Sequence, residues 1–428
     1  MKSVVNIIGA GLAGTEAALY LANRGIKVRL FEMRLVKESP AHKTKLAAEL
    51  VCSNSLKNNA LTNACGLLKE EMRILGSEII KAADESQIPG GNALVVDREI
   101  FSRTLDEKIR THPNIEYIGE EVTKIPKGIT IIASGPLTSP SLEQELKEII
   151  GEESLYFFDA SSPIIEFSSI NLDIGYFKSR YSQGDDSYLN CPFTREEYAL
   201  FYNELINAKT AKVSSFDTNY FSGCMPIEVM AKKGFDTLRF GPLKPRGLEK
   251  DKASRPFAVV QLRQEDINAT LYNLVGFQTN LTYSEQERVF RLIPGLENAK
   301  FVRFGLMHRN TYINSPASLN SDLSLIANND IFIAGQLSGV EGYVESAASG
   351  LLVAINVLNR LKKKETLQIP YLSMHGALIN YIINASPVHF SPMNANFGIL
   401  PNPKNLSREE QIELALNSIK QFKEEIEN

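Results

Sequence analysis

The stretch that decides the fold lies near the N-terminus and reads Val4-Val5-Asn6-Ile7-Ile8-Gly9-Ala10-Gly11-Leu12-Ala13-Gly14. Residues 4–8 are apolar and rich in β-branched side chains, which predicts a buried strand. Residues 15–25 have the composition of a helix that ends at a glycine. Residues 26–32 predict a second strand that ends at Glu32, 18 positions beyond the last of the three glycines. A strand, a GxGxxG turn, a helix and a second strand with a terminal acid form a dinucleotide-binding unit.

Each glycine of the turn has its own physical role. Gly9 permits the tight turn, Gly11 lets the backbone approach a pyrophosphate, and Gly14 lets helix and strand pack closely. The phosphates would meet the N-terminus of the helix, where free N–H groups and the helix dipole favour anions. We expect Glu32 to accept hydrogen bonds from the adenosine ribose. The cofactor-binding residues predicted from this unit are Gly9, Ala10, Gly11, Leu12, Ala13, Gly14 and Glu32.

Two later segments favour FAD over NAD as the dinucleotide. Residues 130–136 and 330–336 each predict a strand that ends in a turn of small residues. A glycine-rich turn and a helix of small residues, 346–350, follow the second of them. Two such returns to the nucleotide-binding fold are typical of flavoproteins, an inference that depends partly on analogy between folds. Gly335 and Gln336 therefore join the predicted cofactor-binding residues.

The predicted fold class is α/β, with a Rossmann-like FAD-binding domain and an inserted substrate domain of mixed α and β structure. A length of 428 residues is enough for at least two domains. We expect the FAD-binding domain to be discontinuous, over residues 1–150 and 325–428, and the inserted substrate or RNA domain to span 151–324. The segment from Ser407 onward has the pattern of an amphipathic surface helix.

Composition excludes several classes of protein. A net charge of −4 argues against a general nucleic-acid coat. Four scattered cysteines and five histidines form neither a disulfide framework nor a metal signature. No segment is apolar enough to span a membrane, and no signal peptide precedes the glycine motif, so we expect a cytoplasmic protein. No stable protein partner is predicted.

Two cysteines stand in settings that suit chemistry. Pro226 suits the first turn of a helix, which would place Cys224 beside a helix N-terminus that favours a thiolate. Cys52 lies among small polar residues in a predicted loop, where a thiol is more exposed than in a core. For both cysteines, the alternative is a purely structural role as a small side chain packed in the interior. Cys65 and Cys191 have no distinguishing neighbours, and we expect them to be packing residues.

A basic segment follows Cys224 directly. Residues 232–263 hold nine basic and three acidic side chains, an excess of six positive charges. A solvated loop is the usual explanation of such a run. Its position beside Cys224 instead favours contact with RNA phosphates. The predicted RNA-contact residues are Lys232, Lys244, Arg246, Lys252 and Arg255.

Several long segments resemble the TrmFO family, the folate- and FAD-dependent tRNA (uracil-54, carbon 5) methyltransferases. Besides the glycine motif and residues 32–34, they are residues 48–56, 66–73, 223–228, 270–279, 307–311, 339–343 and 392–398. Asn280 and Ser338 depart from the family pattern, which has His and Thr there. The family is also similar in fold to a larger flavoprotein that modifies the wobble uridine of tRNA.

The resemblance implies a role for each of the two cysteines. The Cys224 thiolate would add to carbon 6 of uracil and make carbon 5 nucleophilic. Cys52 would remove the proton from carbon 5 or manage the flavin adduct. Methylenetetrahydrofolate would supply the carbon by way of reduced FAD, and NAD(P)H would regenerate the reduced flavin. The target base would have to leave its stack to reach the site.

Three other functions stay open at this point. Some relatives with the same chemistry act on a uridine of 23S ribosomal RNA, and no residue of this sequence excludes that target. An FAD-dependent oxidoreductase of a small metabolite would share the glycine motif, but it would need neither a thiolate nor the basic segment. A non-catalytic flavoprotein that binds RNA is disfavoured by the free Cys52 and Cys224.

Overall fold

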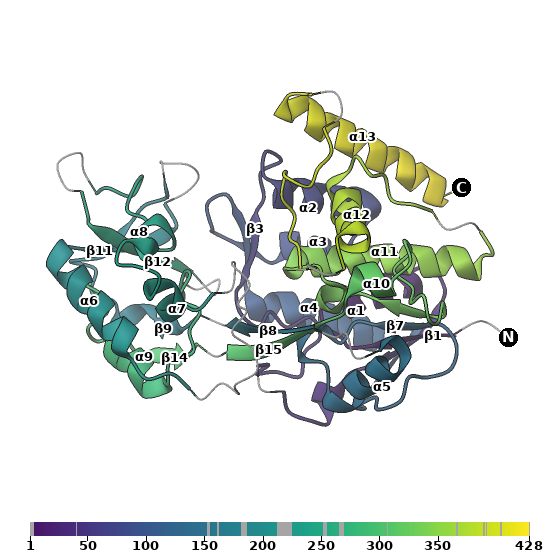
Figure 1. Cartoon of the computed structure of the whole chain (residues 1–428), viewed down its shortest axis with the longest axis horizontal. Helices are drawn as coiled ribbons and strands as arrows, with labels where there is room; N and C mark the ends of the chain where they lie inside the picture. The colour runs from purple at the N-terminus through teal and green to yellow at the C-terminus, as the bar shows by residue number, and fades with distance from the viewer. Residues whose placement is uncertain are drawn as a thin grey trace.

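The computed structural model describes residues 4–39, 41–151, 155–160, 162–180, 186–211, 225–250, 255–264, 269–305, 307–364, 367–387, 390, 392–402 and 405–427. Two of the predicted site residues, Cys224 and Lys252, lie outside these ranges. Figure 1 shows two lobes, one on each side of a narrow connection.

A five-stranded parallel sheet organises the first lobe and confirms the predicted α/β class. Its strand order is β16-β7-β1-β2-β6. The strands are β1 (Val4–Ile8), β2 (Lys27–Phe31), β6 (Ile115–Ile118), β7 (Thr130–Ile132) and β16 (Ile331–Ile333). Ile8 at the end of β1 lies opposite Phe31 on β2 and Ile132 on β7. The carboxyl ends of these strands therefore meet at one edge, where open α/β sheets place their ligands.

Helices surround this sheet. Besides α1 (Leu12–Ala22) and α11 (Tyr343–Leu361), the helices and short turns of this lobe are α2 (Ala64–Leu75), α3 (Glu78–Glu85), α4 (Arg98–Thr111), α5 (Pro140–Ile150), α10 (Ser315–Ser318), α12 (Met374–Asn384), α13 (Arg408–Glu427), η1 (Met33–Leu35), η2 (Gly135–Leu137) and η5 (Gly335–Ser338). A Cβ at Gly350 would lie 2.3 Å from the carbonyl of Ala13, so α11 and α1 are in backbone contact.

The predicted amphipathic helix is confirmed as α13. It buries Ile412, Ile419 and Phe422 and lies across the top of the first lobe in Figure 1. A small antiparallel sheet, in the order β3-β5-β4, completes this lobe. Its strands are β3 (Ser55–Asn58), β4 (Gln87–Ile88) and β5 (Ala93–Val96). Because β3 starts three residues after Cys52, this sheet holds the end of the Cys52 loop.

The second lobe contains a six-stranded sheet in the order β10-β11-β12-β13-β9-β14. Its elements are β9 (Ile164–Glu166), η3 (Phe167–Ser169), β10 (Tyr176–Phe177), β11 (Tyr188–Phe193), α6 (Arg195–Asn207), α7 (Ile227–Ala231), α8 (Thr237–Phe240), β12 (Ala258–Gln264), β13 (Leu271–Leu274), α9 (Tyr283–Phe290) and β14 (Phe301–Arg303). All its strand pairs are antiparallel. Its hydrophobic core is separate from that of the first lobe and includes Phe193, Phe201 and Phe290.

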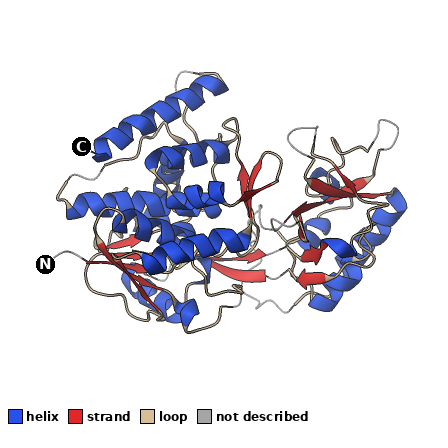
Figure 2. Cartoon of the chain, turned by 180° about the vertical axis from the view of Figure 1, so that it is seen from behind, coloured by secondary structure: helices blue, strands red, loops and turns tan. Residues whose placement is uncertain are grey.

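Two antiparallel strands, β8 (Leu155–Ala160) and β15 (Met307–Tyr312), join the lobes. Figure 1 shows them side by side between the lobes, and Figure 2 shows the same arrangement from behind. The domain boundaries near 150 and 325 remain a prediction. No helix in the described part of the chain has the length and apolar character that a membrane span requires.

Candidate functional site

A large cleft opens at the carboxyl edge of the parallel sheet. It holds about 1220 Å³ of space free of protein atoms, including its open mouth. The predicted site residues that line it are Gly9, Gly11, Leu12, Ala13, Glu32, Cys52, Gly335 and Gln336. The structure thus brings Cys52 and the predicted cofactor-binding turns into one cavity.

The three motif glycines differ in what surrounds them. Gly9 has a φ of +99°, and a Cβ there would lie 2.6 Å from the carbonyl of Ala133. A Cβ at Gly14 would lie 1.9 Å from the carbonyl of Gly9. At Gly11 a Cβ would meet nothing within 4 Å. The tight turn and the close packing expected of Gly9 and Gly14 are therefore present, while Gly11 leaves open space on the cleft side.

The start of α1 suits an anionic group. Gly11 is its N-cap, and no side chain among the described residues caps it. The first N–H groups of a helix have no intrahelical partner, and together with the dipole they favour a negative charge. Because this end of the helix borders the cleft, the residues present fit a pyrophosphate bridge.

Glu32 is held more tightly than the sequence suggests. One oxygen, Oε2, accepts from Ala10 N at 2.8 Å and from Arg34 Nη2 at 3.1 Å. The other, Oε1, accepts from Arg34 N at 2.9 Å and from Arg34 Nε at 3.0 Å. A carboxylate offers about four acceptor positions. A ribose would therefore have to share these oxygens with Arg34.

Charge keeps this pair ionised. Burial by itself would raise the pKa of Glu32, but the Arg34 guanidinium and the N–H donors more than offset it. The pKa of Glu32 consequently lies below its ordinary value. Arg34 was not predicted as a site residue, because nothing in its spacing from the motif marks it.

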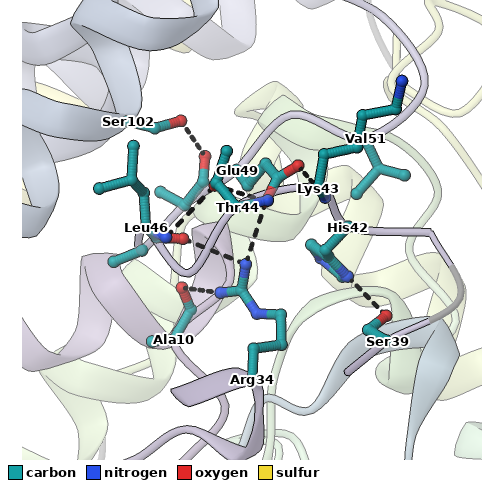
Figure 3. A network of polar contacts seen from close by, with 12 residues as sticks. Ala10, Arg34, Ser39, His42, Lys43, Thr44, Leu46, Glu49, Val51 and Ser102 are labelled. Carbon is teal, nitrogen blue, oxygen red and sulfur yellow. Dashed lines mark hydrogen bonds and ion pairs between the residues drawn. The ribbon is translucent and has the colours of Figure 1, made fainter. Parts of the chain in front are cut away.

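Figure 3 shows how Arg34 connects the glycine turn to the segment before Cys52. Its guanidinium donates to the carbonyl of Leu46 at 3.1 Å and lies 3.5 Å from Oε2 of Glu49. Glu49 in turn accepts from the backbone N–H groups of Lys43 and Thr44, at 2.8 and 3.0 Å. These contacts fix the segment that leads into the Cys52 loop.

Cys52 is half-buried, and Tyr343 at the start of α11 lies against it. The Tyr343 hydroxyl accepts from the N–H groups of Cys52 at 2.7 Å and Ser53 at 3.2 Å. It also lies 3.0 Å from Cys52 Sγ. Since both acceptor positions of the hydroxyl are in use, its proton is directed at the sulfur. Burial holds the pKa of Tyr343 well above its ordinary value, so the hydroxyl keeps that proton.

Asn54 bonds the Cys52 loop to the second lobe. Its side chain is fully buried. It donates to the carbonyls of Val96 at 3.2 Å and Gln264 at 2.9 Å. It accepts from Arg263 Nε at 3.2 Å and Asn273 Nδ2 at 3.4 Å. All four hydrogen-bonding positions of this amide are satisfied, and three of the partners belong to β12 and β13.

Two of the nine basic side chains in residues 232–263 are bound within the protein, so the excess positive charge available to RNA is smaller than the sequence indicates. Arg263 is only 9% exposed and donates to Ser53 Oγ at 2.6 Å, so its charge is not available to RNA. Arg239 is paired with Asp236 and lies over the Phe257 ring. Of the predicted RNA contacts that the structure describes, Lys232, Arg246 and Arg255 are exposed, and Lys244 is half-buried.

The remaining cysteines behave differently from Cys52. Cys65 and Cys191 are buried, which confirms that they are packing residues. Burial raises the pKa of Cys65 to about 11 and that of Cys191 to about 12, so both thiols stay protonated at neutral pH. After Cys224, Pro226 is the N-cap of α7 and does not lie in its first turn. This helix is only five residues long, so its dipole would favour a thiolate less than we expected.

Removing the Asn54 side chain should weaken the contact between the lobes. Asn54→Ala would leave the Arg263 guanidinium and two buried carbonyls short of partners, which costs about 3–5 kcal/mol of unfolding free energy. Urea denaturation followed by circular dichroism measures this loss. Asn207→Ala is the matched control, because this exposed amide, among the residues that the structure describes, bonds only within its own helix. A loss of less than about 1 kcal/mol for Asn54→Ala would contradict the assigned role.

Comparison with known proteins agrees with this fold and extends it. Residues 4–365 match the family model described as glucose inhibited division protein A. Two crystal forms of Aquifex aeolicus GidA superpose with a TM-score of 0.72. The form II structure shares 16% sequence identity, over 99% of this chain and 73% of that one, so the likeness shows a common fold.

Sequence relatives are much more similar. A methylenetetrahydrofolate--tRNA-(uracil-5-)-methyltransferase TrmFO of Listeria monocytogenes is 55% identical over 434 residues, covering 100% of both chains. The protein of the same name from Bacillus pumilus is 56% identical over 402 residues, covering 94% of this chain and 93% of its own. This degree of identity over the full length establishes that the chain belongs to the TrmFO family.

Proposed function

We propose that this chain methylates carbon 5 of a uridine in tRNA, with methylenetetrahydrofolate as the carbon donor. The names of relatives more than half identical to it support this activity. We propose further that the target is uridine 54 of the T-loop, that the bound dinucleotide is FAD, and that NAD(P)H is the reductant. The site of action would be the cytoplasm.

One observation carries the proposal: a half-buried thiol and a glycine-rich anion site share a single cleft. An ordinary dinucleotide-dependent oxidoreductase needs the glycine-rich anion site but not the thiol. In this cleft, Gly11 and the N-terminus of α1 would hold the pyrophosphate, and Gly335 and Gln336 would border the rest of the cofactor. When bound, FAD supplies the electrons that reduce the transferred carbon to a methyl group.

The chain's own side chains would perform the steps on uracil. Thiolate addition from Cys224 to carbon 6 moves electron density to carbon 5, which can then bond the incoming carbon. Cys52 would take the proton that carbon 5 must lose, and Tyr343 favours the required thiolate by donating to its sulfur. Loss of that proton would release the new carbon from its carrier as a methylene group double-bonded to carbon 5. Reduction of this carbon by a hydride would form the methyl group, expel the Cys224 thiolate from carbon 6 and restore the C5–C6 double bond.

The proposal is tested with the purified full-length protein, methylenetetrahydrofolate, NADPH and an unmodified tRNA transcript. Nucleoside mass spectrometry should find 5-methyluridine at position 54, and none in a transcript with cytidine at that position. A 23S ribosomal RNA transcript serves as the competing substrate. Product on ribosomal RNA alone would overturn the tRNA assignment, and product on neither RNA would overturn the activity.

Neutralising Lys244 and Arg246 together should weaken tRNA binding. Each phosphate contact contributes about one unit to the slope of log K against log salt, so the Lys244→Ala/Arg246→Ala protein should lose about two units of slope. Filter binding at several salt concentrations measures this change. Lys420→Ala/Lys423→Ala on the acidic helix α13 is the control. An unchanged slope in the first variant would show that Lys244 and Arg246 contact no phosphates and only interact with solvent.

A further inference from the structure

Phe240, the last residue of α8, is 84% exposed, the largest exposed fraction among the bulky apolar side chains that the structure describes. No ring contact involving Phe240 is found among the described residues. Single exposed apolar side chains are common on protein surfaces and need no explanation by themselves. The charge around this one distinguishes it.

Four basic residues lie within eight positions of Phe240 in the sequence, and backbone contacts bring their segments close to it. Lys232 and Lys233 follow α7 directly and are exposed. A Cβ at Gly241 would lie 3.3 Å from Met230 Sδ, which places the end of α8 against α7. The N–H of Lys244 donates to the carbonyl of Gly241 at 3.3 Å, so the chain turns back beside Phe240. We call Phe240 with Lys232, Lys233, Lys244 and Arg246 the Phe240 surface.

Hydrogen bonds from Arg180 hold the loop that carries Lys244 and Arg246. The Arg180 guanidinium donates to the carbonyl of Lys244 at 3.0 Å and to that of Arg246 at 2.6 Å. These bonds hold the backbone of the loop, on which the Arg246 side chain is exposed and the Lys244 side chain is half-buried. Asp236, the acid nearest to Phe240 in sequence, is paired with Arg239.

We propose that Phe240 stacks on an unpaired nucleobase of the RNA substrate while the flanking cations contact its phosphates. The inference rests on the proposed function and adds a second contact site, outside the cleft. An aromatic ring among cations is the combination that single-stranded RNA binds, because every base has a π face and every nucleotide carries a charge. RNA carries one negative charge per nucleotide, so positive charge favours RNA more strongly than a second copy of the chain, whose net charge is only −4.

Phe240→Ala should raise the Kd for an unmodified tRNA transcript about 5- to 150-fold, because stacking on one base contributes about 1–3 kcal/mol. The salt slope should not change, since a phenyl ring displaces no counterions. This separates the effect from that of Lys244→Ala/Arg246→Ala. Phe240→Tyr should restore wild-type affinity because it keeps the aromatic face.

The chain contains no tryptophan, which allows a direct observation of stacking. Phe240→Trp creates a single indole at the proposed contact, excited at a wavelength where tyrosine does not absorb. Titration with the tRNA transcript should quench its emission, and high salt should reverse the quenching. Leu200→Ala is the matched control, since Leu200 is 53% exposed beside acidic residues of α6 and should leave the Kd unchanged.

The outcomes separate this inference from the proposed function. Wild-type affinity in Phe240→Ala, or a Phe240→Trp emission that RNA leaves unchanged, would overturn the stacking role alone. A change of oligomeric state in Phe240→Ala, seen by light scattering, would instead assign the ring to a contact between copies. Absence of tRNA binding by the wild-type protein would overturn the proposed function as well.

Discussion

A Cys224→Ala protein is expected to lose the covalent complex with RNA that contains 5-fluorouracil, while it keeps its dinucleotide. Fluorine at carbon 5 cannot leave as a proton, so a thiolate that has added to carbon 6 remains attached. Without that thiolate no adduct forms, and methylation should fall on the order of 10³-fold or more. Denaturing gels detect the complex, and the visible absorbance of the purified protein reports the cofactor.

The other cysteines make this test specific. Cys52→Ala should also be inactive, but it should still form the adduct through Cys224. Cys65→Ala and Cys191→Ala should methylate nearly normally, because both side chains are buried away from the cleft. A complex that survives in Cys224→Ala would remove the nucleophile role from that residue and give it to Cys52.

Local sequence was enough to predict the parts of the site that depend on backbone geometry. The turn at Gly9 and the packing at Gly14 follow from the need for a tight bend and close approach, and the structure has both. The return of residues 331–333 to the parallel sheet was predicted in the same way. In each case the signal is a short pattern of residue types whose physical reason is local.

The side-chain contacts around Cys52 could not be predicted, because they join distant parts of the chain. Tyr343 reaches Cys52 across 291 residues, and Asn54 reaches Arg263 across 209. No spacing marks such pairs, since they exist only once both lobes have folded. The basic segment shows the same limit. Its charges can be counted in the sequence. Only the fold shows that the Arg263 guanidinium donates its hydrogen bonds to Ser53 and Asn54.

The second large effect is expected at Gly11, where Gly11→Val should abolish binding of the dinucleotide without unfolding the protein. Gly11 has a φ of −74°, an ordinary value for any residue, and a Cβ there would contact no protein atom within 4 Å. The added side chain would occupy cleft space at the start of α1 that the pyrophosphate needs. Occupancy of the purified protein, read from flavin absorbance, should fall below about a tenth of the wild-type value.

The other two glycines provide the contrast that makes this result informative. Gly9→Val and Gly14→Val should both unfold the nucleotide-binding lobe, because their Cβ atoms would lie 2.6 and 1.9 Å from backbone carbonyl oxygens. Stability must be compared between proteins stripped of flavin, since bound cofactor stabilises only the folded state. Stripped Gly11→Val should then unfold within about 1 kcal/mol of the stripped wild type. A folded Gly11→Val protein with full flavin occupancy would place the cofactor elsewhere, because no dinucleotide could bind this turn with a valine side chain between the pyrophosphate and the start of α1.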